Sequence, residues 1–144
     1  MIVRLTVATL LTAALLGVGL PAAETAHSER AATLAHDELT EFRETAARFY
    51  IHNDATRPDI PGASRRYTLR VPDSTTVWLG VGPRNERLRW QHDAHEGHVE
   101  TDLLLDGSLR LDAGSHRLRL RLVRTDDGNR IRVARFKSDA EATG

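Results

Sequence analysis

The chain has 144 residues, no cysteine, and 20 basic residues that balance 20 acidic ones, so its formal net charge at pH 7 is +0. The lack of cysteine excludes a disulfide framework, a thiolate zinc site and a cysteine nucleophile. A balanced charge gives no net positive field, so we expect no nucleic-acid partner. The length suits one domain with a modest core behind an N-terminal targeting segment.

Residues 1–23 are the first predicted element, a hydrophobic membrane anchor or signal segment. Residues 5–23 carry no charge and follow a single basic residue, Arg4. As a helix this stretch spans roughly 28 Å, close to the ~30 Å hydrocarbon core of a bilayer. Arg4 predicts that the N-terminus stays inside and the body lies outside. We therefore expect a single-pass protein of the cell membrane with its C-terminal domain outside.

The alternative is a cleaved signal peptide, which would release the body as a secreted protein. Cleavage after Ala23 would place Pro21 at the −3 position, which makes a poor site. An uncleaved anchor could also contact other membrane helices, because small residues four positions apart allow close helix packing. Those residues are Thr9, Ala13 and Gly17.

Residues 24–50 are predicted to form an amphipathic helix that continues from the apolar segment. Apolar residues recur every three or four positions and define one stripe, as the helical period requires. The stripe contains Ala31, Leu34, Ala35, Leu39, Phe42, Ala46 and Phe49. We expect it to pack on the protein's own sheet. In the alternative interpretation its large members contact helices of other protein subunits; these are Leu34, Leu39, Phe42 and Phe49.

Residues 51–64 are predicted to be a linker, because Pro58, Pro61 and Gly62 interrupt regular structure. From residue 65 to residue 137 the apolar period changes to two, and turn signals separate short segments. This pattern predicts a small antiparallel β domain, either a meander or a half-sandwich. The expected fold class is therefore α+β. Residues 138–144 are expected to form a disordered tail.

Two Asp-Gly pairs predict turns in the β domain. Asp127-Gly128 suits a two-residue type I′ hairpin loop, which would place Leu122 opposite Val133. That register puts the leucines of the first strand and the apolar residues of the second on one face. Asp106-Gly107 is expected to join a strand ending near Leu105 to a short strand at Leu109–Leu111.

Arginines alternate with the leucines of this hairpin and should project from the opposite face. They are Arg117, Arg119 and Arg121, with Arg132 on the adjacent strand. Like charges on one face are unfavourable unless anions or solvent compensate them. The arginines are therefore candidate contacts for an acidic partner surface or anionic lipid headgroups. The alternative is a solvated outer face with Phe136 stacked on Arg119.

Histidines at three-residue intervals form a second candidate site. His92, His95 and His98 stand among several carboxylates, and both groups are ligand types for zinc, copper or nickel. On a strand, however, a spacing of three sends successive side chains to opposite faces. The alternative is an ordinary polar loop. A divalent metal is the one cofactor that the sequence raises.

Catalytic motifs do not occur in the chain. The sequence has no G-x-S-x-G elbow, no Gly-rich phosphate loop and no HExxH zinc motif. We therefore expect a protein that is not an enzyme.

The order of elements resembles that of type IV pilins and pseudopilins, in which a hydrophobic N-terminal helix continues into an amphipathic helix and a small antiparallel sheet. The resemblance covers the whole chain and implies a role in a surface assembly. Two pilin motifs differ here. Met1 to Arg4 stand in place of a basic-glycine processing site, and the first acidic residue is Glu24, at the far end of the apolar stretch.

Three short motifs also resemble a family of short, uncharacterised haloarchaeal proteins that are membrane-anchored or secreted. The motifs are Met1-Ile2, Pro21-Ala22-Ala23-Glu24 and the stretch from Gly114 to Arg124. That family tends to be encoded near type IV pilus-like secretion genes, which implies an accessory or pilin-like role.

These observations together predict a non-catalytic, membrane-tethered extracytoplasmic protein. Its expected work is structural or accessory, within a type IV pilus-like or secretion apparatus, and its expected partners are the membrane and other protein subunits. The alternative is a secreted β domain that binds a small ligand or a divalent metal through the histidine-rich loop.

Overall fold

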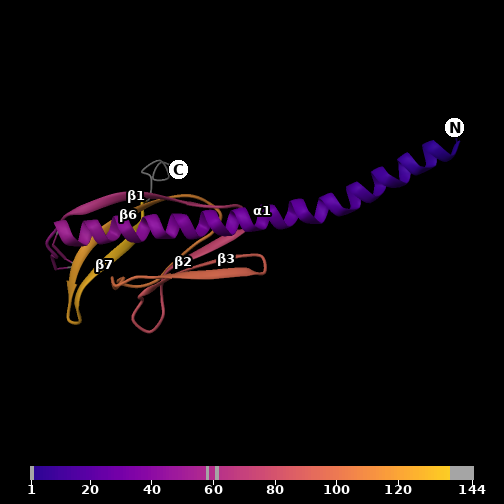
Figure 1. Ribbon diagram of the computed structural model, residues 1–144. Coiled ribbons are helices and arrows are strands. Elements are labelled where there is room, and N and C mark those ends of the chain that lie inside the picture. Colours follow the sequence, from indigo (N-terminus) through magenta and orange to yellow (C-terminus); the bar gives the residue numbers. More distant parts are fainter. Residues whose placement is uncertain (1, 58, 61, 137–144) are drawn as a thin grey trace, which may run out of the picture. The chain divides into compact units, whose positions relative to one another are not determined.

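The fold is α+β, as predicted, with one helix followed by seven strands in the part of the chain that the computed structural model describes (Figure 1). The backbone is described for residues 2–57, 59–60 and 62–136, and the side chains from residue 23 onward within those ranges. The elements are α1 (Ile2–His52), β1 (Ser64–Val71), β2 (Thr75–Val81), β3 (Arg87–His92), β4 (His95–Glu100), β5 (Leu109–Leu111), β6 (Gly114–Thr125) and β7 (Gly128–Arg135).

The chain divides into two compact units, residues 1–30 and residues 31–144, and the fold below is that of the second unit. The predicted anchor, with Thr9, Ala13 and Gly17, lies outside the residues whose side chains are described. Among the described residues, no helix combines the length and the apolar character needed to cross a bilayer.

The strands form two antiparallel sheets, where the sequence had predicted one small sheet. Sheet I has the order β1-β6-β7, and sheet II has the order β4-β3-β2-β5. Alternation of apolar and polar residues reports which face of a strand is buried, but it does not report which strands pair. The sequence pattern therefore located most strands without separating the two sheets.

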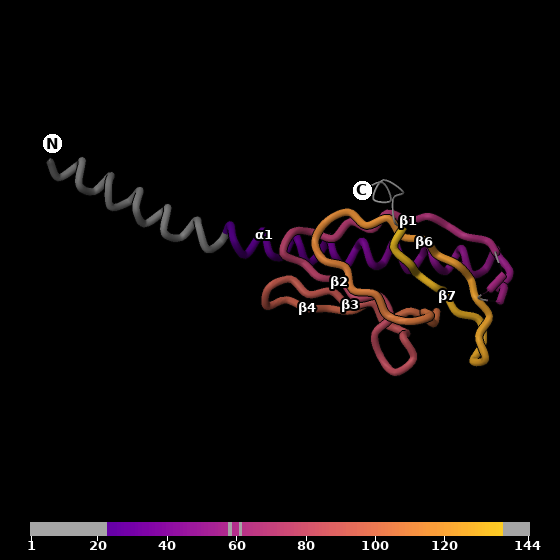
Figure 2. Tube along the Cα trace, turned by 180° about the vertical axis from the view of Figure 1, so that it is seen from behind, coloured from indigo at the N-terminus to yellow at the C-terminus, as the bar shows by residue number. Residues whose placement is uncertain are grey.

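The second half of α1 runs along both sheets and shares one core with them (Figures 1 and 2). Leu39 and Phe42 of α1 are 0% and 1% exposed. They form a single cluster with residues of sheet I and of sheet II. The two sheets contribute mainly Leu69, Val71, Leu118, Leu120, Leu122 and Ile131 from sheet I, and Val77, Leu79, Leu88, Trp90, Val99 and Leu111 from sheet II. Each large side chain buried in this way contributes roughly 1.5–3 kcal/mol to folding.

The C-terminal end of α1 is capped by the side chain of the residue that follows it. Asn53 Nδ2 donates a hydrogen bond to the Phe49 carbonyl at 2.9 Å, which satisfies a carbonyl that the ending helix leaves without a main-chain partner. The connection from α1 to β1 lies within the predicted linker. There the main chain of Thr56 makes hydrogen bonds to Leu122 and Arg124 of β6.

The β6–β7 hairpin has the predicted faces but a different register. Leu122 pairs with Ile131, and Val133 pairs with Leu120, so the strands are shifted by two residues from the expected alignment. Gly128 has a φ of 116° and pairs with Thr125, and the turn itself is made by the two aspartates before the glycine. A type I′ turn needs positive φ at both loop residues, and neither aspartate has it. A two-residue shift preserves which side chains share a face.

The short strand predicted at Leu109–Leu111 is present as β5, but the strand expected to end near Leu105 is not. Strand β4 ends at Glu100, and β5 pairs with β2 rather than with the strand before it. Leu105 instead makes an isolated parallel bridge to Ile131 of β7. Residues 101–108 therefore connect two strands of sheet II by a path along sheet I, against which Leu105 is buried.

Tyr67 on β1 makes the stability of the folded domain depend on pH in the alkaline range. Its ring meets the Phe42 ring edge-on, with centroids 5.5 Å apart. Burial raises the pKa of the Tyr67 phenol, and the carboxylates of Glu38 and Glu41 act in the same direction. The folded-state pKa lies above the unfolded value of about 10. The contribution of the neutral Tyr67 phenol to the stability of the fold is therefore fully present below pH 10 and is lost as the pH rises above it.

We therefore expect the urea midpoint of the full-length chain in detergent to fall more steeply between pH 9 and pH 11 than that of a Tyr67→Phe variant. Circular dichroism at each pH measures both. Tyr50→Phe is the matched control, since Tyr50 is the other tyrosine of the chain, and it should keep the wild-type slope. Equal slopes for wild type and Tyr67→Phe would contradict the assignment.

Candidate functional site

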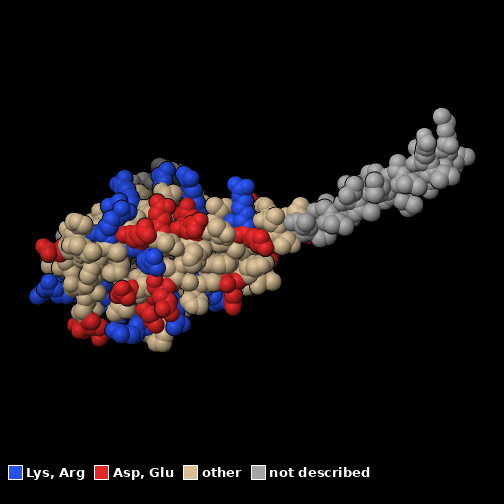
Figure 3. Space-filling model, in the orientation of Figure 1, with Lys and Arg blue, Asp and Glu red and all other residues tan. Residues whose placement is uncertain are grey.

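The outer face of sheet I carries the predicted arginines. Arg117, Arg119 and Arg121 alternate with core leucines that are at most 3% exposed, so they project away from the core. The register aligns Arg66 of β1 with Arg119 and Arg132 of β7 with Arg121. Three adjacent strands thus bring arginines to one face. In Figure 3 basic side chains gather along the edge next to β1, whereas acidic side chains gather over α1.

The three predicted arginines differ in what they contact. The Arg119 guanidinium lies 4.7 Å from the centre of the Phe136 ring, which confirms the predicted stacking, and Arg66 lies 4.9 Å from the same ring. Arg121 donates a hydrogen bond to the Ile60 carbonyl at 2.8 Å. The Arg117 guanidinium has no hydrogen bond or ion pair with any residue that the structure describes. Arg117 is therefore the predicted arginine that is most available to a ligand.

Arg132 is committed to the fold. It forms an ion pair with Asp106 at 2.6 Å, and its Nε donates to the same carboxylate at 2.8 Å. Both side chains are partly exposed, so the pair contributes at most about 1 kcal/mol. It fastens the 101–108 connection to β7, where the main chains of Asp106 and Ile131 are also hydrogen bonded at 2.8 Å.

The three histidines of the candidate metal site are not brought together. His92 and His95 face each other across the β3–β4 hairpin, whereas His98 pairs with Arg89 and so points to the other face. His92 is 3% exposed, and His95 and His98 are exposed. Within the described ranges, no three histidine, aspartate or glutamate side chains are close enough to hold a metal ion.

His92 has a structural environment. The Thr75 hydroxyl donates its one proton to the Asp73 carbonyl at 3.1 Å, so it accepts from His92 Nδ1 at 2.9 Å. The second ring nitrogen, Nε2, lies 3.4 Å from a carboxylate oxygen of Asp93. The Nδ1 atom of His92 is thus committed to β2, and its Nε2 atom lies beside the β3–β4 turn.

The apolar stripe of α1 mostly serves the protein's own core. Leu39, Phe42 and Phe49 are at most 5% exposed and contact the two sheets. The interpretation that these three residues contact other subunits is therefore replaced by internal packing. Leu34 differs, because it is 47% exposed. It remains available on the surface of the helix.

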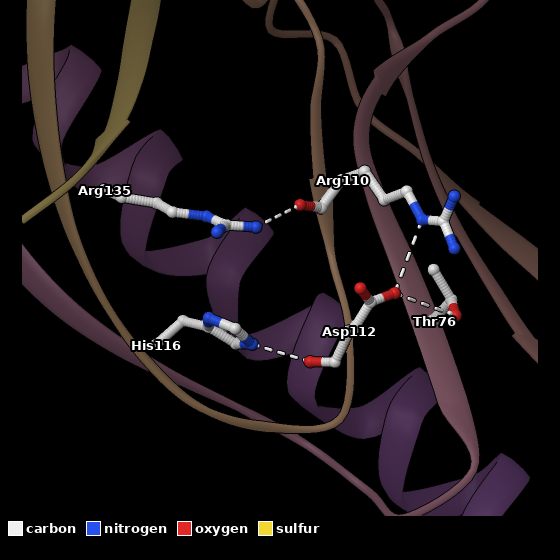
Figure 4. A network of polar contacts seen from close by, with 5 residues as sticks. All are labelled: Thr76, Arg110, Asp112, His116 and Arg135. Atoms are coloured by element: carbon white, nitrogen blue, oxygen red, sulfur yellow. Dashed lines mark hydrogen bonds and ion pairs between the residues drawn. The ribbon is translucent and has the colours of Figure 1, made fainter.

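A polar network at the β5–β6 turn joins the two sheets (Figure 4). The Asp112 carboxylate accepts from Thr76 at 3.4 Å and pairs with Arg110 at 3.3 Å. The Asp112 carbonyl accepts from His116 Nε2 at 2.6 Å. The Arg110 carbonyl accepts from Arg135 at 2.6 Å. The turn thereby fixes where the His116 and Arg135 side chains lie, and nothing in the sequence pattern indicated this pairing.

The second unit is thus an α+β domain in which the second half of a long helix packs on two antiparallel sheets, one with an arginine-rich outer face. The chain belongs to the family described as domain of unknown function DUF7311, whose profile matches residues 2–136. Comparison with curated proteins finds no match, and comparison with solved structures finds none either.

Proposed function

We propose that the protein is a non-catalytic, membrane-tethered extracytoplasmic component of a type IV pilus-like or secretion apparatus, with a structural or accessory role. One observation carries this proposal. α1 covers Ile2–His52 and so contains the charge-free stretch 5–23, while its second half buries an apolar stripe against antiparallel sheets. Type IV pilins, which the chain resembles in layout, combine a membrane helix with a β domain in this way.

Two further features support the proposal. The short motifs shared with haloarchaeal proteins encoded near pilus-like secretion genes suggest the same setting. Leu34 and Ile51 are 47% and 75% exposed on α1 and give the helix apolar surface for a neighbouring subunit.

The first test concerns the tether. We expect the full-length mass in a membrane fraction that resists a high-pH carbonate wash, with the β domain open to added protease. A Leu11→Arg/Leu15→Arg variant should lose this association, because each arginine in the centre of a membrane helix costs about 2.5–3.5 kcal/mol. A soluble wild-type product shortened by about 22–26 residues, as signal cleavage would produce, would overturn the tethered reading.

The second test concerns the apparatus. The chain has no cysteine, so Leu34→Cys provides a single thiol on the exposed side of α1. After labelling native membranes with a photoactivated thiol cross-linker, we expect an adduct whose partner is a subunit of a pilus-like or secretion assembly by mass spectrometry. Arg124→Cys on β6 is the control and should give no such adduct. Equal adducts at both positions, or none at Leu34→Cys, would contradict the proposed contact.

A further inference from the structure

A hollow lies at the end of β7, beside the first residues of β6. It has a volume of about 360 Å³ and is lined by Ser115, His116 and Arg117 of β6 together with Arg135 and Phe136. No carboxylate is among these lining residues. Two guanidinium groups, an imidazole and a hydroxyl therefore meet at one place, and the guanidinium groups and the hydroxyl can each donate a hydrogen bond to an anion.

Two of the lining side chains are held in place before any ligand arrives. His116 Nε2 donates a hydrogen bond to the Asp112 carbonyl of the β5–β6 turn, and one Arg135 nitrogen donates to the Arg110 carbonyl of β5, so both side chains are oriented (Figure 4). A guanidinium has five N–H donors, so Arg135 keeps donors for a ligand. Pre-oriented groups lose less side-chain entropy on binding.

Arg117 supplies the uncommitted charge. Its guanidinium has no hydrogen-bond or ion-pair partner across the described ranges, although it lines the hollow. Arg66 and Arg119, stacked on Phe136, add positive charge next to it. Clustered arginines without acidic partners repel each other unless an anion neutralises them.

The main chain of β6 is also oriented toward the hollow. The last described hydrogen bond between β7 and β6 runs from Phe136 N–H to the Arg117 carbonyl at 2.7 Å. In an antiparallel ladder alternate residues of a strand face the same neighbour. Ser115, two residues before Arg117, therefore turns its main-chain N–H to the side of β6 on which β7 lies, where its side chain lines the hollow.

We infer that this hollow binds a phosphate-type oxyanion, either free phosphate or a phosphomonoester headgroup. Arginine forks match phosphate oxygens in two parallel hydrogen bonds. A tetrahedral ligand with several oxygens can use donors from β6 and from β7 at once. The inference concerns the β domain alone and does not depend on the proposed apparatus role.

The test follows amide resonances of the ¹⁵N-labelled full-length chain in zwitterionic detergent as sodium phosphate is added at constant ionic strength. We expect saturating shifts for Ser115, His116, Arg117 and Phe136. Sodium chloride in place of phosphate should leave these amides unchanged. Shifts that rise linearly without saturation, or equal shifts with chloride, would overturn the inference.

Variants separate a specific site from general positive charge. Arg117→Gln and Arg135→Gln should each raise the phosphate Kd about tenfold, because each removes a charge-assisted hydrogen bond. Arg124→Gln removes the same charge from an exposed position on the same strand, outside the hollow. It should change the Kd less than twofold. An equal loss in all three variants would show only non-specific attraction and refute the site.

Comparing a lipid with inorganic phosphate shows which kind of phosphate group the hollow binds. A short-chain phosphatidic acid, below its micelle concentration, is titrated against the same amides. Tighter binding than inorganic phosphate identifies a lipid headgroup as the ligand, and weaker binding identifies a free phosphate. Failure of both probes to produce saturating shifts would overturn the inference, whatever the outcome of the tethering and cross-linking tests.

Discussion

Gly80→Ala is expected to lower the free energy of unfolding by about 3–4 kcal/mol, since two separate penalties of about 1–3 kcal/mol apply at this position. Gly80 has a φ of +82°, which residues with a Cβ rarely adopt. A Cβ at this position would also overlap the main-chain oxygen of Gly107. A main-chain atom cannot move aside by changing a rotamer, so sheet II or the 101–108 connection would have to shift.

The register explains why a glycine is needed here. The pairing of β2 with β3 shifts between Leu79 and Val81, so Gly80 is the extra residue of a bulge. The bulge lies where the 101–108 connection passes, at Gly107.

Gly107→Ala is the matched control for this prediction. Gly107 also has a positive φ, +98°, but a Cβ there would meet no atom within 4 Å. It should therefore lose only the conformational part, about 1–2 kcal/mol. Urea unfolding of both variants, followed by circular dichroism in the same detergent, measures the difference. Equal losses would show that the close approach of the two glycines does not contribute.

The spacing of apolar residues predicted the features of this fold that depend only on residues close together in the sequence. The apolar stripe of α1 was located correctly except at one edge. At 100° per residue, Leu34 lies at the margin of the arc, away from Leu39 and Phe42, and this explains why it stays exposed while they are buried. The alternation of leucine and arginine on β6 likewise fixed the two faces of that strand.

The same spacing did not predict which strands pair or in which register. The actual β6–β7 register depends on the φ of Gly128, and the partner of β5 depends on the path of residues 101–108. The phosphate-type hollow shows the consequence most clearly. Arg117 could be selected from its alternation, whereas His116 and Arg135 join it only because their side chains bond to the main chain of the β5–β6 turn and of β5.

Phe42→Ala is expected to lower the free energy of unfolding by about 3–5 kcal/mol, the usual range for deleting a buried phenylalanine side chain. Phe42 is 1% exposed and lies edge-on to Tyr67, 5.5 Å away between ring centroids. Its removal would leave a cavity between α1 and sheet I, because well-packed surroundings close only partly around a deleted ring.

The same variant tests whether the stripe of α1 belongs to this chain or to a partner. If Phe42 contacted another subunit, the isolated monomer would keep its stability after the substitution. Thermal unfolding of the monomer in detergent, checked by light scattering, therefore decides between the two. Leu34→Ala is the matched control on the same helix and should change the stability by less than about 0.5 kcal/mol, because its side chain is already half exposed. A large loss for Phe42→Ala alone would show that the Phe42 side of α1 packs inside this chain and is not available to other subunits.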